Sequence, residues 1–206
     1  MLRQPQFTID RQNGVTTLAL RSDDGTNRLT RACVRDLTDT IAELARTPEP
    51  LILTGNDKFF SAGADLTEIA ALDGPEAYQF SVMGQSLMNA VENFPASVYA
   101  AIRGYCMGGG LDLALSCQHR IAGPHAIFGH RGAALGLITG WGGTQRLPRL
   151  LGKGGALEMF VAAEKLHAGQ ALQVGLIDAI SQDPVEEAKR RIAERQSTTG
   201  PPAGSV

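Results

Sequence analysis

Three consecutive glycines, Gly108 to Gly110, stand between a short apolar run and an apolar segment of helical character, and they constrain the fold more than any other feature. The run before them, residues 97–102, is bounded by Pro95 and Gly104, which is typical of a buried strand. Glycine has no Cβ atom, so the triplet permits a sharp turn and a close approach of a ligand to its amides. The first amides of the following helix have no internal partner. The pattern favours an anion-binding turn, although the same glycines also suit tight packing of a helix on a strand.

A second turn of the same kind follows the apolar run of residues 51–55. After a polar loop, residues 59–69 lead into a predicted helix that begins at Asp65, and Asp65 and Glu68 have the spacing of a capping box. The amide of Ala64 is then expected at the mouth of that helix, among small residues. Two such amides that converge on one oxygen atom form an oxyanion hole, in which each donor contributes roughly 3 to 4 kcal/mol of transition-state stabilisation.

Four signatures resemble those of the enoyl-CoA hydratase/isomerase (crotonase) superfamily, in that family's order and spacing. They are Phe60 to Leu66, Gly104 to Asp112, Phe128-Gly129, and Gly140 to Pro148 with Gly152-Lys153. The resemblance covers residues 7–180. It implies an α/β fold of the crotonase (ClpP/crotonase) type, built from ββα repeats with parallel sheet layers covered by helices. We expect this core domain over residues 1–182, followed over residues 183–206 by a short C-terminal helix and a disordered tail.

The resemblance also implies the residues of the site. Ala64 and Gly109 supply the two oxyanion-hole amides for a thioester carbonyl, and Asp112 stands where hydratases carry the first of two catalytic glutamates. The other residues expected to bind the substrate or its coenzyme A are Arg28, Ser61, Ala62, Gly63, Asp65, Leu66, Gly108, Gly132 and Leu135. Coenzyme A is part of the acyl-CoA thioester substrate, so we expect no permanently bound cofactor.

The second hydratase glutamate has no counterpart here, because its position is Gly132 and no Asp or Glu occurs between Asp112 and Glu158. Asp112 lies in the first turn of a helix, so it is either the catalytic acid/base or a residue that stabilises the helix dipole. One substitute for the glutamate is His130 or Arg131, although a solvated loop histidine is the simpler interpretation of His130. A bound anion is another substitute, and a reaction that needs no second carboxylate is the third. If the glycine leaves room, Gly132→Glu is expected to raise hydration.

We therefore expect an enzyme that stabilises a thioester enolate, with enoyl-CoA hydration or double-bond isomerisation as its reaction. A catalytically weak or inactive acyl-CoA-binding subunit is the alternative from another class. A decarboxylase or a relative of the naphthoate synthases is also open; the latter use bicarbonate, but their nearby aspartate corresponds to Thr139 here. A peptidase of the Clp type needs a Ser-His-Asp set, and Ser116 with His119 or His125 shows no convincing spacing.

Composition argues against several other classes of protein. The net charge of -2 is unsuited to nucleic-acid binding, and the absence of an apolar signal core or membrane-length run predicts a cytoplasmic protein with no membrane partner. Three cysteines without a C-x-x-C pair predict reduced thiols, and four histidines without ligand spacing predict no metal site. A homo-oligomer, as a trimer or hexamer, is implied by the resemblance alone.

Strand and helix patterns alternate along the chain, which predicts parallel strands with covering helices. The expected elements include a hairpin at Asn13-Gly14, a helix capped by Thr30, and helices over residues 65–72, 76–94, 156–163 and 184–195, with a tail from Ser197. Typical members of the family continue into further helices that cover the site. This sequence contains only one such helix. We expect a natural short form of the family, a truncated chain, or a chain whose final helices are replaced by a partner.

Overall fold

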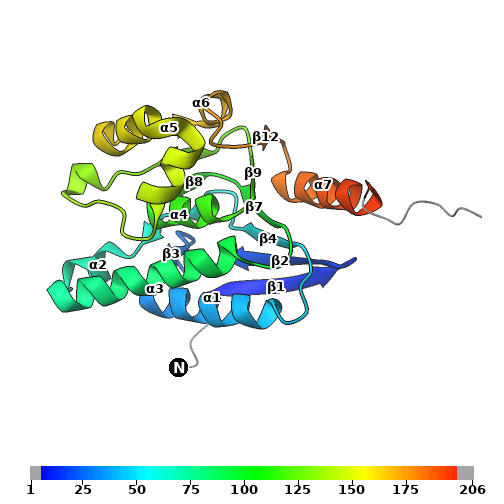
Figure 1. Ribbon diagram of the computed structural model, residues 1–206, viewed down its shortest axis with the longest axis horizontal. Coiled ribbons are helices and arrows are strands. Elements are labelled where there is room, and N and C mark those ends of the chain that lie inside the picture. The colour runs from blue at the N-terminus through cyan, green and yellow to red at the C-terminus, as the bar shows by residue number, and fades with distance from the viewer. Residues whose placement is uncertain (1–5, 199–206) are drawn as a thin grey trace, which may run out of the picture.

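The chain folds into two main β-sheets with helices packed around them, as Figure 1 shows. The computed structural model describes residues 6–198. Ser197 belongs to the last helix, and the rest of the tail predicted after it, from residue 199 on, lies outside the described residues.

The larger sheet has the order β1-β2-β4-β7-β9-β12, and the smaller one has the order β11-β10-β8-β5. The larger contains β1 (Phe7–Gln12), β2 (Val15–Leu20), β4 (Leu51–Thr54), β7 (Val98–Ile102), β9 (His119–Ala122) and β12 (Ala179–Ile180). The smaller contains β5 (Phe59–Ser61), β8 (Tyr105–Met107), β10 (Ile127–Gly129) and β11 (Leu166–His167), and β3 (Arg28–Leu29) pairs separately with β6 (Gly63–Ala64). Neighbouring strands in these sheets are parallel except β1 with β2 and β10 with β11, which confirms the predicted alternation.

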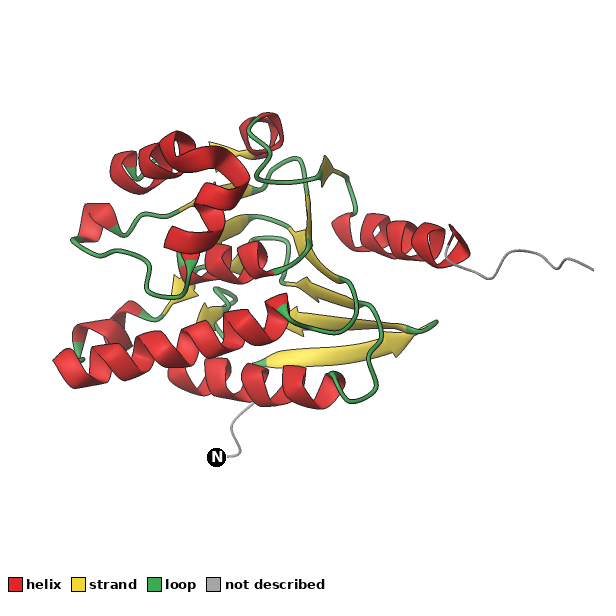
Figure 2. Cartoon of the chain, in the orientation of Figure 1, coloured by secondary structure: helices red, strands yellow, loops and turns green. Residues whose placement is uncertain are grey.

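Helices of very different lengths lie between these strands and after the last of them (Figure 2). They are α1 (Arg31–Leu44), α2 (Leu66–Ala70), α3 (Gly74–Glu92), α4 (Gly109–Ser116), the 3-10 turn η1 (Ala133–Leu135), α5 (Gly143–Ala162), α6 (Ala168–Gln173) and α7 (Pro184–Thr198). Within residues 6–198, no helix is long and apolar enough to cross a membrane.

The first elements of the structure agree with the predictions made from the sequence. Asn13 and Gly14 both have a left-handed backbone, with φ of 54° and 71°, which is the geometry that an Asn-Gly hairpin turn requires. Thr30 caps α1 by accepting a hydrogen bond from the Cys33 amide at 3.2 Å, and the apolar stripe predicted for that helix is buried. Each large apolar side chain in that stripe contributes roughly 1.5 to 3 kcal/mol by its burial. The predicted hairpin and first helix are confirmed.

The helix α3 begins two residues before its predicted start. The run Asp73 to Pro75, which we expected to break the helical pattern, forms its first turn instead, because Asp73 and Glu76 make a full capping box and proline is tolerated there. Further along α3, a Cβ atom at Gly84 would overlap the ring of Trp141. The glycine therefore admits the indole into the core.

The helix α5 differs most from its prediction, since it begins at Gly143 rather than near residue 156. It contains Pro148 and a kink at Gly152, where φ is 73°, and these residues made the segment look like a loop. Packing overrides those local preferences, because Leu147 is fully buried and Arg146, also buried, donates a 2.9 Å hydrogen bond to Asn89 on α3.

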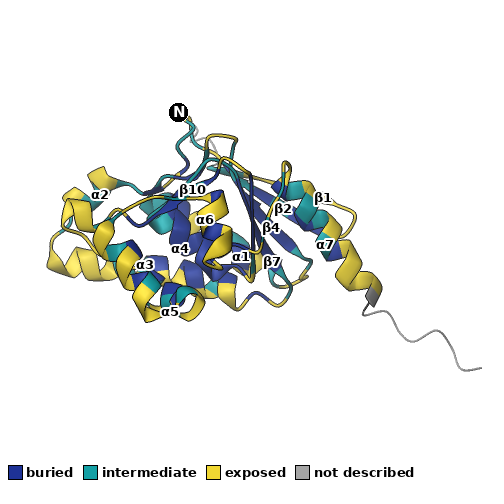
Figure 3. Ribbon diagram, turned by 90° about the horizontal axis from the view of Figure 1, so that it is seen from above, coloured by how far each residue is buried: buried dark blue, intermediate teal, exposed yellow. Residues whose placement is uncertain are grey.

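The last helix, α7, packs on the face of the larger sheet that lies away from α1 and α3 (Figure 3). Its buried residues Ala188 and Ile192 meet a small apolar cluster on the sheet that includes Tyr99. The amphipathic helix predicted over residues 184–195 is confirmed, and it continues to Thr198.

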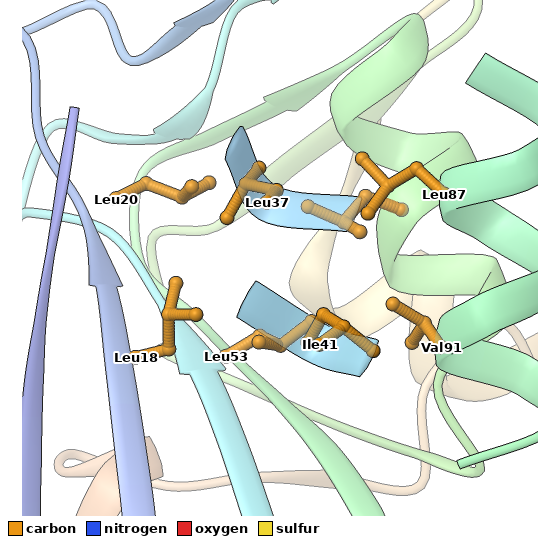
Figure 4. Close-up of a pocket in the computed structure, with 8 residues that line it drawn as sticks. Leu18, Leu20, Leu37, Ile41, Leu53, Leu87 and Val91 are labelled. Atoms are coloured by element: carbon orange, nitrogen blue, oxygen red, sulfur yellow. The ribbon is translucent and has the colours of Figure 1, made fainter. Parts of the chain in front are cut away.

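The opposite face of that sheet, with α1 and α3, encloses a small apolar cavity (Figure 4). It is lined by Leu18, Leu20, Leu37, Ile41, Leu53, Leu87, Val91 and Leu113. Its lining side chains carry no polar atom that could orient a ligand, so we interpret it as a packing gap in the core rather than a binding site.

Candidate active site

The two strand-to-helix turns meet in the structure. A Cβ atom at Gly63 would lie 2.7 Å from the carbonyl oxygen of Met107 and 3.1 Å from the amide nitrogen of Gly109. A Cβ atom at Gly109 would lie 3.3 Å from the amide nitrogen of Ala64. The backbone around the Ala64 and Gly109 amides is therefore in close contact, which only residues without a side chain permit at Gly63 and Gly109.

Buried hydrogen bonds hold the first turn in place. The Ser61 hydroxyl donates to the carbonyl of Asn27 at 2.7 Å and accepts from the Gly63 amide at 3.1 Å, and Ser61 is fully buried. The Ala62 amide donates to the Thr26 carbonyl at 2.9 Å. Ser61 thus fixes the conformation of the turn, and contact of Ser61 and Ala62 with coenzyme A stays a prediction.

The second turn depends on glycine for its shape and for its fit. Gly108 has φ of 50° and ψ of -120°, and its amide donates to the Gly129 carbonyl at 2.9 Å. A Cβ atom at Gly110 would lie 2.7 Å from the Ser61 Cβ, so the triplet packs directly on the first turn. Gly109 is the first residue of α4, where an amide has no acceptor within the helix.

At the start of α2, Asp65 is the N-cap rather than the first helical residue. Its carboxylate accepts from the Thr67 amide at 2.8 Å and from the Glu68 amide at 3.2 Å. The Glu68 carboxylate does not complete the predicted capping box, because it accepts a 2.7 Å hydrogen bond from the Arg31 amide at the start of α1. Glu68 therefore joins two helices instead of closing one.

Three of the predicted coenzyme A residues lie at the surface. Arg28 is half exposed, with its guanidinium 3.3 Å from Asp24 and 3.8 Å from Asp65. Leu66 is 53% exposed and Leu135 is 58% exposed. Exposed apolar side chains are available for a ligand, and the role of all three residues in binding stays a prediction.

Asp112 lies in the first turn of α4 and is buried, with 1% of its surface exposed. Its Oδ2 atom accepts a hydrogen bond from the Thr139 hydroxyl, and its Oδ1 atom lies 3.3 Å from Nε2 of His130. His130 is only 4% exposed, and its ring lies 5.1 Å from that of Phe160. The interpretation of His130 as a solvated loop residue is wrong, because the loop after β10 turns this side chain inward onto Asp112.

Gly143, the first residue of α5, covers this pair. A Cβ atom there would overlap Oδ1 of Asp112 and lie 3.0 Å from Nε2 of His130. The glycine therefore provides the space in which the carboxylate and the imidazole meet.

Gly132 stands at the start of η1, and its surroundings are filled by the loop itself. Its carbonyl accepts from the amides of Leu135 and Leu137, each at 2.8 Å. A Cβ atom at Gly132 would lie 2.7 Å from the Leu137 carbonyl oxygen. The condition set for a gain by Gly132→Glu, that the glycine leaves room for a longer side chain, is not met, since backbone atoms lie beside it.

Sequence reasoning did not pair Asp112 with His130 and Thr139, although part of the signal was available. The parallel strands β8 and β10 are neighbours, and their register places Met107 opposite Gly129. Because the carboxyl ends of parallel strands share one edge of the sheet, the residues that follow each strand begin side by side. That rule predicts a polar contact between the two loops, but not the position of Thr139.

Comparison with known proteins agrees with this architecture. The sequence profile of the family described as Enoyl-CoA hydratase/isomerase matches residues 10–203. The crotonyl-CoA hydratase of Syntrophomonas wolfei is 34% identical over 177 residues, which cover 84% of this chain and 68% of that protein.

Solved structures show the same fold. Pseudomonas aeruginosa DspI superposes with a TM-score of 0.89 at 32% identity, covering 96% of this chain and 82% of that one. The enoyl-CoA hydratase of Bacillus anthracis gives a TM-score of 0.87 at 34% identity, covering 95% and 78% of the two chains. These matches confirm the predicted crotonase-like α/β fold. By sequence profile, relatives and fold together, the chain belongs to the enoyl-CoA hydratase/isomerase family.

Proposed function

We propose that this protein hydrates the double bond of an enoyl-CoA thioester, with Asp112 as its acid/base group and the amides of Ala64 and Gly109 as its oxyanion hole. The observation that carries the proposal is the close approach of the two glycine-rich turns next to a buried carboxylate. The names of the relatives, which include a crotonyl-CoA hydratase, support hydration over an inactive binding role.

The reaction needs two proton transfers and one developing negative charge. The oxygen of water bonds to C3 of the thioester, the double-bond electrons move to the thioester oxygen, and Asp112 accepts the proton that water releases. The amides of Ala64 and Gly109 stabilise the resulting enolate oxygen. Asp112 then returns a proton to C2, the carbonyl re-forms, and one water molecule has been added.

We further propose that a single carboxylate performs both transfers. By the family resemblance Gly132 stands where hydratases carry the second glutamate, and a Cβ atom there would lie 2.7 Å from the Leu137 carbonyl oxygen. A second acid/base group typically raises the reaction rate by about 100-fold or more. Hydration by this protein is therefore expected to be slow beside that of a relative with both glutamates.

The remaining parts of the proposal concern the surroundings of the site. Arg28, Asp65 and Leu66 lie beside the first turn and are proposed to contact coenzyme A. A trimer or hexamer is proposed from the family resemblance, and a cytoplasmic location is proposed from the composition of the sequence. Light scattering of the purified protein measures its mass directly, and a monomer at assay concentration would contradict the oligomer.

The proposed function is tested with a panel of thioesters. Crotonyl-CoA is expected to lose its conjugated absorbance when the protein is added, and 3-hydroxybutyryl-CoA is expected as the product. Binding of crotonyl-CoA that saturates without any turnover would contradict the proposal and favour the binding subunit. Turnover of a malonyl-type thioester alone would favour a decarboxylase.

A further inference from the structure

The contact between His130 and Asp112 has a feature that the proposed function leaves unexplained. Nε2 of His130 and Oδ1 of Asp112 are both buried and lie 3.3 Å apart, but neither atom makes a hydrogen bond within the described residues, to the other or to a third group. A buried polar atom without a partner is costly, and two of them facing each other are costlier still. A proton on Nε2, with a small rotation of the imidazole ring toward Oδ1, would satisfy both atoms.

We propose that His130 is a positioning residue that carries a proton on Nε2 and donates it as a hydrogen bond to Oδ1 of Asp112. Thr139 donates to Oδ2 of the same carboxylate. Asp112 is thus held at both oxygens, by a residue from the loop after β10 and by one from the loop before α5. The inference rests on the proposed function, since it assigns a task to the partner of the proposed acid/base group.

This arrangement suits a site with a single carboxylate. An ionised carboxylate has about four lone-pair positions, so two donated hydrogen bonds leave positions free to accept the proton of water. With a second glutamate absent, Asp112 must point first at water and then at C2, and its orientation matters for both steps. The tautomer with its proton on Nδ1 would turn the lone pair of Nε2 toward the carboxylate and would donate no hydrogen bond to it.

Packing fixes His130 in this position independently of any substrate. Its ring contacts that of Phe160 on α5, and Gly143 on the same helix leaves the space for the pair. We therefore expect turnover to depend on the hydrogen bond that His130 donates, and not on the shape of its ring alone.

The test compares two replacements of His130 in the full chain. His130→Phe keeps a ring against Phe160 but donates nothing, whereas the side-chain amide of His130→Gln is able to donate near the Nε2 position. His125→Gln, in an exposed loop, is the matched control. A hydrogen bond to a charged group is typically worth enough to lower kcat about 10- to 100-fold when it is lost.

With crotonyl-CoA as substrate, His130→Phe is expected to lower kcat by about that factor and to leave KM within about threefold, while His130→Gln recovers most of the loss. A folded His130→Phe with the wild-type kcat would overturn the inference. So would a His130→Gln as slow as the phenylalanine variant, because donation would then not be the task.

A second readout does not depend on activity. In protein labelled with ¹⁵N-histidine, NMR is expected to show the His130 proton on Nε2 and a shift of that nitrogen in Asp112→Asn. A proton on Nδ1 with a bare Nε2 would overturn the inference. The wild-type assay is carried out first, because absence of crotonyl-CoA hydration rejects the proposed function. The NMR result then still decides whether His130 donates a hydrogen bond to Asp112.

Discussion

Nε2 of His130 lies 3.3 Å from Oδ1 of Asp112 in the interior of the protein. His130 follows β10 directly, and Asp112 lies in the first turn of α4, which follows the neighbouring parallel strand β8. A helix and a loop that follow neighbouring strands at the same edge of one sheet therefore place a carboxylate and an imidazole in contact. The arrangement provides the proposed acid/base residue with a buried neighbour.

Gly143→Ala tests the space that this pair occupies. Its methyl group would overlap Oδ1 of Asp112, so we expect at least a 10-fold loss of kcat for crotonyl-CoA and a lower melting temperature, since overpacking costs about 1 to 3 kcal/mol. Gly154→Ala on the same helix is the control, because nothing lies within 4 Å of a Cβ there. The control is expected to keep its activity and gain up to about 1 kcal/mol of stability. Equal activity of the two variants would contradict the geometry.

Gly132→Glu tests the proposal that Gly132 stands where hydratases carry the second glutamate. Because a Cβ at residue 132 would lie 2.7 Å from the Leu137 carbonyl oxygen, the glutamate must displace the loop. We expect no gain in crotonyl-CoA hydration and a loss of about 1 to 3 kcal/mol in the free energy of unfolding, measured with urea. Faster hydration with unchanged stability would show that the loop accommodates a second carboxylate.

Gly109→Ala is not a mild substitution in this fold. Its methyl carbon would lie 2.5 Å from the ring of Trp141, whose indole N–H donates to the Phe80 carbonyl at 3.2 Å. We expect a lower melting temperature together with loss of turnover. In Gly109→Ala/Trp141→Phe, the smaller ring is expected to restore part of the stability. Restored stability with full hydration would show that the thioester oxygen does not need the open space that glycine leaves beside the amide of residue 109.

Buried thiols predict an alkaline limit to stability. Burial raises the pKa of the Cys117 thiol to about 12, and it raises the pKa of Cys106 as well. In the unfolded chain a thiol titrates at about pH 8.5. The stability that the protein gains by keeping the buried thiol neutral is therefore complete below that pH and is lost progressively as the pH rises toward about 12. In urea unfolding, Cys117→Ala is expected to lose less stability than the wild type between about pH 9 and pH 11. Identical pH dependence of the two proteins would count against the burial of this thiol as the cause.

Local signals predicted the parts of the fold that local physics decides. The Asn13-Gly14 turn requires a left-handed backbone at both positions, and Thr30 is a strong helix cap, so both elements follow from a few neighbouring residues. The glycine triplet at Gly108 to Gly110 likewise marked the turn that packs on Ser61. In each case the residue type and the required backbone geometry agree.

Residues whose structure depends on distant partners were not predictable in this way. The start of α5 at Gly143 depends on the burial of Leu147 and on the contact of Arg146 with α3, which outweigh the local effect of Pro148. His130 was expected to be solvated because its neighbour Asp112 is distant in sequence and is brought to it only through the strand register.

The central claim is that Asp112 performs the proton transfers of enoyl-CoA hydration. The most direct measurement is the initial rate of crotonyl-CoA hydration by the wild type and by Asp112→Asn, with Asp36→Asn as an exposed control on α1 and with melting temperatures recorded for all three. Asparagine preserves the shape and the Thr139 contact but cannot accept the proton, so kcat is expected to fall on the order of 100-fold or more with the fold intact. A folded Asp112→Asn that hydrates crotonyl-CoA at the wild-type rate would contradict the account.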